Sequence, residues 1–74
     1  MSKTIYSKDH RFLTEQLKKA RIEAELDQEK AADLLGKTQS YISKIEAGQR
    51  RVDVVQLKEF ARVYKKSLDY FLKK

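Results

Sequence analysis

The feature that most constrains this chain is its near lack of residues that interrupt a helix. Among 74 residues there is no proline, and the only two glycines are Gly36 and Gly48. Proline disrupts a helix interior most strongly and glycine next, so a chain almost without them favours helix nearly throughout. We therefore expect an all-α protein in which each glycine ends a helix.

Five helical segments can be placed from their apolar spacing and their caps. Apolar residues recur at intervals of three and four, which gives each helix one buried face. The helices are expected over residues 9–24, over residues 28–35 after the cap Asp27, and over residues 39–47 after the cap Thr38. Two more are expected after the caps Asp53 and Ser67. The expected core includes Leu13, Leu17, Ile42, Ile45, Leu57 and Phe60. This predicts a compact five-helix domain over residues 9–74 behind a loose arm of residues 1–8.

Composition excludes several classes of function. There is no cysteine and His10 is the only histidine, so we expect no disulfide, metal site or cofactor. No glycine-rich phosphate loop and no nucleophile beside a base can be recognised, so an enzyme is not expected. No apolar run is long enough to span a membrane and no signal peptide opens the chain, which predicts a cytoplasmic protein.

The charge balance leaves two interpretations open. Seventeen Lys and Arg face eleven Asp and Glu, a formal net charge of +6. A basic surplus in a small domain favours a polyanionic partner, namely DNA, RNA or an acidic membrane surface. Lysine-rich helix surfaces that only keep the protein soluble would give the same balance. Net charge therefore does not distinguish a nucleic-acid or membrane partner from a surface that is only soluble, and the sequence motifs are needed to do so.

The second and third expected helices are separated by a very short turn. Only Gly36, Lys37 and Thr38 lie between them. Such a turn favours a steep crossing, and the small residues Ala31 and Ala32 permit close approach. This combination is typical of a helix-turn-helix.

The third helix has one polar side. At about 100° per residue, its apolar residues share one side of the helix. The opposite side carries Gln39, Ser40, Ser43 and Lys44. Glutamine can bond adenine bidentately, lysine can donate to guanine, and serine can contact several base edges. No acid interrupts this side, which favours base reading in the DNA major groove, although an ordinary solvated surface would also be polar.

The surroundings of this helix are basic. Residues 37–51 include the cations Lys37, Lys44, Arg50 and Arg51 against the single acid Glu46. The positive N-terminal ends of the second and third helices, near Gln28 and Gln39, are also suited to phosphate. We therefore expect Gln28, Lys37, Arg50 and Arg51 to contact the DNA backbone.

The segment QEKAADLLGKTQSYISKIEAGQRR resembles the helix-turn-helix of Cro-like and phage-repressor-like regulators, the XRE family. The flanking stretches LKKARIEAELD and VDVVQLKEFARVYKKSLDYFL are similar to the rest of its five-helix domain, so the resemblance covers residues 10–72. The residues at the family's characteristic spacings are Gln28, Ala32, Gly36, Ile42, Ile45, Glu46 and Gly48.

The resemblance implies a sequence-specific transcription regulator, often a repressor, that binds a palindromic operator on double-stranded DNA as a homodimer. The positions that contact DNA would be Gln28, Thr38, Gln39, Ser40, Ser43 and Lys44, with Arg50 and Arg51 in a phosphate-contacting loop. It also implies an inward ion pair between Arg21 and Glu46 that orients the third helix.

Four residues depart from the family pattern. Glu25 and Lys65 stand where glycine is frequent beyond a helix, and positive φ there would cost each up to about 1 kcal/mol relative to glycine. Lys37 and Lys66 stand at usually apolar positions, where their aliphatic stems can cover apolar surface.

The last expected helix leaves a second function open. It carries Tyr70, Phe71 and Leu72, and a helix this short is not expected to bury all three. They would either complete the core or, as we expect, form part of a dimer seam. An uncommitted terminal helix also suits a protein-interaction module, such as an antitoxin that neutralises a partner protein.

Overall fold

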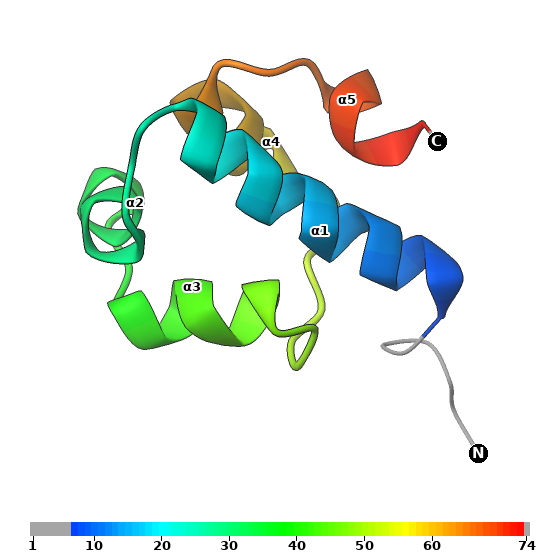
Figure 1. Cartoon of the computed structure of the whole chain (residues 1–74), viewed down its shortest axis with the longest axis horizontal. Coiled ribbons are helices and arrows are strands. Elements are labelled where there is room, and N and C mark those ends of the chain that lie inside the picture. Colours follow the sequence, from blue (N-terminus) through cyan, green and yellow to red (C-terminus); the bar gives the residue numbers. More distant parts are fainter. Residues whose placement is uncertain (1–6, 74) are drawn as a thin grey trace.

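Five α-helices make up most of residues 7–73, the part of the chain that this computed structural model describes. They are α1 (Lys8–Glu23), α2 (Gln28–Leu35), α3 (Gln39–Glu46), α4 (Val54–Tyr64) and α5 (Leu68–Leu72), with no strand among these residues. In Figure 1, α3 lies along one edge of the molecule below α1, and α2 is seen almost end-on. The steep crossing predicted for α2 and α3 is therefore present.

Each helix begins at a side chain that accepts from a backbone N–H group three residues later. The capping oxygens of Asp27, Thr38, Asp53 and Ser67 lie 2.7–3.4 Å from those nitrogens, as predicted. The first helix starts one residue earlier than expected, because Ser7 Oγ accepts from the backbone N–H of His10 at 3.1 Å. Ser7 therefore caps α1 and Lys8 is its first residue, so neither belongs to the expected arm, whose remaining residues 1–6 lie outside the described part.

Four residues at helix ends have positive φ. Gly36 (φ 69°) and Gly48 (φ 78°) supply the conformation that glycine adopts at least cost. Glu25 (φ 61°) and Lys65 (φ 60°) adopt it as well, at the two positions where the resemblance indicated that glycine is frequent. Both ends therefore carry a side chain where glycine would be less strained.

The core lies between all five helices. Its fully buried large side chains are those of Leu17, Ile42, Ile45, Phe60 and Phe71. Of the other expected core residues, Leu57 is buried and Leu13 packs against the core from a partly exposed position.

The prediction of a seam on α5 was wrong for Phe71, whose exposure is only 1 %. The short helix turns its aromatic face inward: Tyr70 packs against the core, and Gln16 Nε2 of α1 donates to the Tyr70 carbonyl at 3.0 Å. Leu72 is the one residue of the predicted seam that remains exposed, at 60 %. Even this short helix packs its aromatic side chains into or against the core, because its hydrogen bond with α1 holds it in place.

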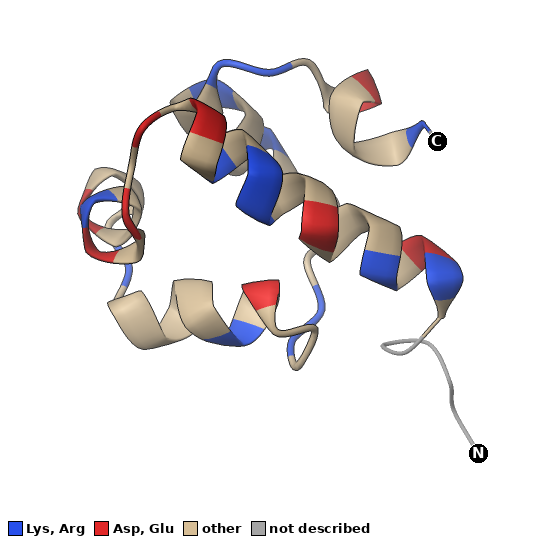
Figure 2. Ribbon diagram, in the orientation of Figure 1, with Lys and Arg blue, Asp and Glu red and all other residues tan. Residues whose placement is uncertain are grey.

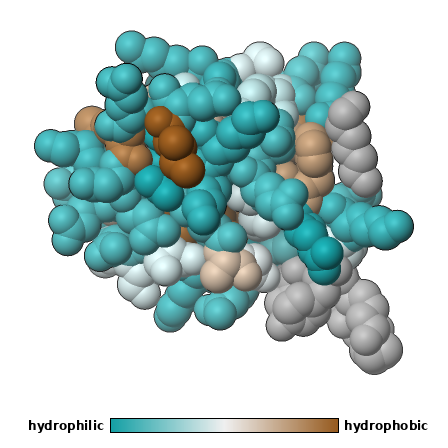
Figure 3. Space-filling view, in the orientation of Figure 1, coloured by the Kyte–Doolittle hydropathy of each residue, from teal (hydrophilic) through white to brown (hydrophobic). Residues whose placement is uncertain are grey.

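No helix of the described part is long and apolar enough to cross a membrane. Apolar side chains reach the surface in Figure 3 only as separate patches among hydrophilic residues.

Candidate nucleic-acid interface

The polar side of α3 faces outward. Gln39, Ser40, Ser43 and Lys44 are all exposed. On the opposite side of the helix, Tyr41, Ile42 and Ile45 are buried against the rest of the domain. The helical repeat thus separates an anchoring face from a free one.

A buried ion pair anchors the far end of α3 to α1. Arg21 Nε lies 2.7 Å from Glu46 Oε2, and Arg21 Nη2 lies 3.1 Å from Oε1. Arg21 Nη1 also donates to the Leu26 carbonyl at 2.8 Å. Only 10 % and 6 % of the two side chains are exposed, and the hydrogen bond with Glu46 raises the pKa of Arg21 despite its burial. This is the pair that the resemblance implied.

The same carboxylate is connected to the first residue of α3. Gln28 Nε2 donates to Glu46 Oε1 at 3.0 Å, and Gln39 Nε2 donates to Gln28 Oε1 at 3.2 Å. Sequence reasoning treated Gln28 as a DNA backbone contact and missed this network. Hydrogen bonds between amides on separate helices leave no spacing pattern that a sequence could reveal.

Two cations lie beside the ring of Tyr41. Lys37 Nζ lies 5.3 Å from the ring centroid and Arg50 Cζ lies 5.0 Å from it. Burial raises the pKa of the Tyr41 hydroxyl although Arg50 opposes the shift, so the side chain is neutral at pH 7. The structure therefore gathers two of the predicted backbone contacts, Lys37 and Arg50, on a buried aromatic residue of α3.

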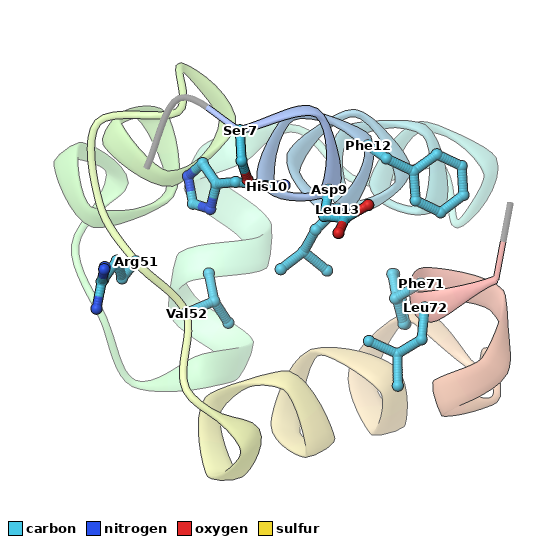
Figure 4. A pocket seen from close by; sticks show the side chains of 9 residues that line it. All are labelled: Ser7, Asp9, His10, Phe12, Leu13, Arg51, Val52, Phe71 and Leu72. Carbon is cyan, nitrogen blue, oxygen red and sulfur yellow. Dashed lines mark hydrogen bonds between the residues drawn. The ribbon is translucent and has the colours of Figure 1, made fainter. Parts of the chain in front are cut away.

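Thr38 and Arg51 have other surroundings. The Thr38 hydroxyl caps α3 by accepting from the Tyr41 N–H at 3.1 Å. Arg51 is exposed and lines a cavity between the start of α1, the α3–α4 loop and α5 (Figure 4). The neighbouring cations of the loop thus point to different parts of the surface.

The exposed surface of residues 37–51 is more basic than its sequence indicates. Its single acid, Glu46, is buried in the ion pair with Arg21. Its four cations are all exposed, namely Lys37, Lys44, Arg50 and Arg51. Figure 2 shows α3 as largely uncharged, with basic residues near its end and in the loop that follows. This surface offers cations and uncharged hydrogen-bonding groups but no exposed carboxylate.

The cavity in Figure 4 is lined by Ser7, Asp9 and His10 together with Arg51 and apolar residues. The hydrogen bond between Ser7 and His10 runs from the backbone N–H to the hydroxyl, and His10 Nε2 is buried without a partner in residues 7–73. This is a helix cap rather than a nucleophile beside its base. Nor do three His, Asp or Glu residues gather as a metal site anywhere in the described chain.

The helix-turn-helix family profile matches residues 17–71, a range that contains α2, α3 and α4 entirely. None of the curated proteins compared with the chain is similar enough to count as a relative.

Proposed function

This chain belongs to the XRE-type helix-turn-helix family of DNA-binding transcription regulators, and we propose that it reads a specific operator through the outward face of α3. Gln39, Ser40, Ser43 and Lys44 are the base-reading residues of this proposal. Lys37, Thr38, Arg50 and Arg51 contact phosphates beside them, and Gln28 supports Gln39 from behind. Binding of this kind makes the protein a repressor when the operator overlaps a promoter.

The observation that carries the proposal is the direction of the hydrogen bonds that end at Gln39. A carboxylate only accepts, so Gln28 must turn its NH₂ group toward Glu46. The Gln28 oxygen then faces Gln39, which must in turn donate its own NH₂ group. This fixes the orientation of an amide that could otherwise flip.

The fixed amide has a definite preference among bases. Gln39 uses one N–H on Gln28 and keeps its oxygen and its second N–H for another partner. Adenine offers a donor at N6 and an acceptor at N7 in the major groove, which complement that pair of groups. We therefore expect adenine opposite Gln39, with guanine as the favoured partner of Lys44.

The proposal includes a homodimer on a palindromic operator, because one recognition helix spans only a few base pairs. The alternative of a protein-interaction module rested on an uncommitted last helix. Phe71 and Tyr70 are packed in or against the core, so α5 no longer favours that alternative. Operator binding would take place in the cytoplasm, on the nucleoid.

Selection of binding sites from a random pool of duplex DNA tests the proposal directly. We expect a palindromic consensus with adenine at one conserved position of each half-site. Gln39→Ala and Lys44→Ala should each reduce discrimination between consensus and altered sites by about 1–3 kcal/mol per lost base contact. Lys18→Ala, which removes an exposed lysine of α1, is the matched control and should leave discrimination unchanged.

Arg50→Ala should weaken binding to every duplex alike and reduce the slope of log affinity against log salt by about one. If Gln39→Ala and Lys44→Ala bind with the wild-type consensus, α3 does not read the bases and the proposal is wrong.

A further inference from the structure

Two separate loops bring their cations to one aromatic ring. Lys37 belongs to the turn between α2 and α3, and Arg50 belongs to the loop between α3 and α4. Both charged groups lie within 5.3 Å of the centroid of the Tyr41 ring. A neutral aromatic ring attracts cations through the negative charge of its face, so the ring can hold both side chains near it.

The ring itself is firmly placed. It is parallel to the ring of Phe60 within 6°, with the centroids 6.3 Å apart, and Phe60 is buried. Tyr41 is 9 % exposed, so its position is fixed by packing while its edge stays at the surface. Long cationic side chains that rest on a fixed ring lose fewer conformations when they bind a ligand.

Neither cation has an acidic partner at the distance of an ion pair among the residues that the structure describes. Among residues 7–73, the carboxylates within 4.0 Å of a Lys or Arg pair with Arg21, Lys66 and Lys73, and not with Lys37 or Arg50. Asp53 and Glu59 act electrostatically on Tyr41 from α4 and its cap but make no ion pair with either cation. Two gathered positive charges without a counter-ion favour an anion between them.

We propose that Tyr41 is a positioning residue whose ring holds Lys37 and Arg50 together as a seat for one DNA backbone phosphate beside α3. This inference rests on the proposed function, and it adds a role for an aromatic residue that touches no base. The seat would raise affinity for any duplex and fix how α3 lies along the groove, because phosphate contacts set register and orientation.

A double-mutant cycle on a duplex of random sequence tests the role of the ring. Tyr41→Leu removes the aromatic face and keeps an apolar side chain, and we expect it to weaken binding about three- to tenfold. In a protein that already carries Lys37→Ala and Arg50→Ala, the same change should have almost no further effect. Tyr41→Phe keeps the ring and should bind like the wild type.

A second replacement guards against a variant that fails to fold. Pentafluorophenylalanine at position 41 has nearly the size of phenylalanine but lacks the negative ring face. It should bind random duplex several-fold more weakly than Tyr41→Phe at an equal melting temperature. If the role of Tyr41 were purely structural, its replacement would lower the melting temperature, and the double-mutant cycle would give no coupling energy between Tyr41 and the pair Lys37 and Arg50.

Three results would overturn the inference. First, the losses of affinity caused by Tyr41→Leu and by the two cation changes could multiply, as independent effects do. Second, the fluorinated variant could bind with the same affinity as Tyr41→Phe. Third, Tyr41→Phe could lose as much affinity as Tyr41→Leu, which would assign the effect to the hydroxyl group. In each case salt-dependent binding by the wild type would leave the proposed function intact. A wild type that binds no duplex would overturn both proposals.

Discussion

Two ion pairs that both involve the last turn of α1 have the same length and different surroundings. Arg21 Nε and Glu46 Oε2 are 2.7 Å apart, as are Lys66 Nζ and Glu23 Oε1. The first pair is almost entirely buried, whereas 26 % of the Lys66 side chain and 43 % of the Glu23 side chain are exposed. Distance alone therefore says little about what an ion pair contributes.

The difference lies in what each carboxylate holds. Glu46 accepts from Arg21 and Gln28 and so connects α1 and α2 to the recognition helix. Glu23 makes its ion pair with Lys66, whose ammonium group also lies 4.6 Å from the Tyr70 ring centroid. Water and salt screen the exposed pair, while loss of one partner of the buried pair leaves a charge without solvation.

The largest expected effect is that of breaking the buried pair from one side. Arg21→Ala or Glu46→Ala should reduce the free energy of unfolding by about 3–5 kcal/mol, because the remaining charge stays buried without a partner. Urea denaturation followed by circular dichroism measures the loss. Unchanged stability in both variants would mean that the pair is not structurally important.

Replacing both partners separates stability from recognition. Arg21→Met combined with Glu46→Leu should recover most of the stability lost in the single variants, since two apolar groups of similar volume leave no unpaired charge. The amide of Gln28 then lacks the acceptor that orients it, so discrimination at the site of Gln39 should fall. A double variant with wild-type discrimination would show that the buried carboxylate does not orient Gln39.

A smaller effect is expected near the exposed pair, where the backbone is strained. Lys65→Gly should stabilise the domain by up to about 1 kcal/mol, because φ is 60° at this position. Lys58→Gly is the matched control: Lys58 is exposed inside α4, where glycine should cost about 1 kcal/mol. Thermal melting of both variants tests this, and equal shifts of one sign would contradict it.

The smallest effect belongs to the exposed pair itself. Glu23→Gln should leave the melting temperature near pH 7 almost unchanged. The hydrogen bond with Lys66 lowers the pKa of Glu23, so whatever stability the pair adds is present above the unfolded-state pKa and is lost as the pH falls through the folded-state pKa. Melting curves from pH 7 to pH 2 should therefore converge at the acid end, and curves that diverge there would contradict the assignment.

The sequence predicted the helices and the outward face of α3 well because both depend on local chemistry. Capping oxygens and apolar spacing act within a few residues, so Asp27, Thr38, Asp53 and Ser67 were found where they cap. The burial of Phe71 was missed because it depends on how α1 holds α5, which no local pattern records.

The candidate site divides in the same way. The exposure of Ser40, Ser43 and Lys44 follows from the helical repeat. The tether from Glu46 through Gln28 to Gln39, and the two cations at Tyr41, join residues from different elements. Their geometry depends on the packed domain, so only the residue types, and not their contacts, could be predicted.

The tether has a consequence for how such a protein can change its target. In the described part of the chain, Ser40, Ser43 and Lys44 make no side-chain hydrogen bond or ion pair, so substitutions there can alter sequence preference at little cost to folding. Gln39 is bound to the domain's internal framework, and replacing it disturbs that framework as well. New specificities should therefore arise by variation at the three free positions while the first residue of the helix stays a glutamine.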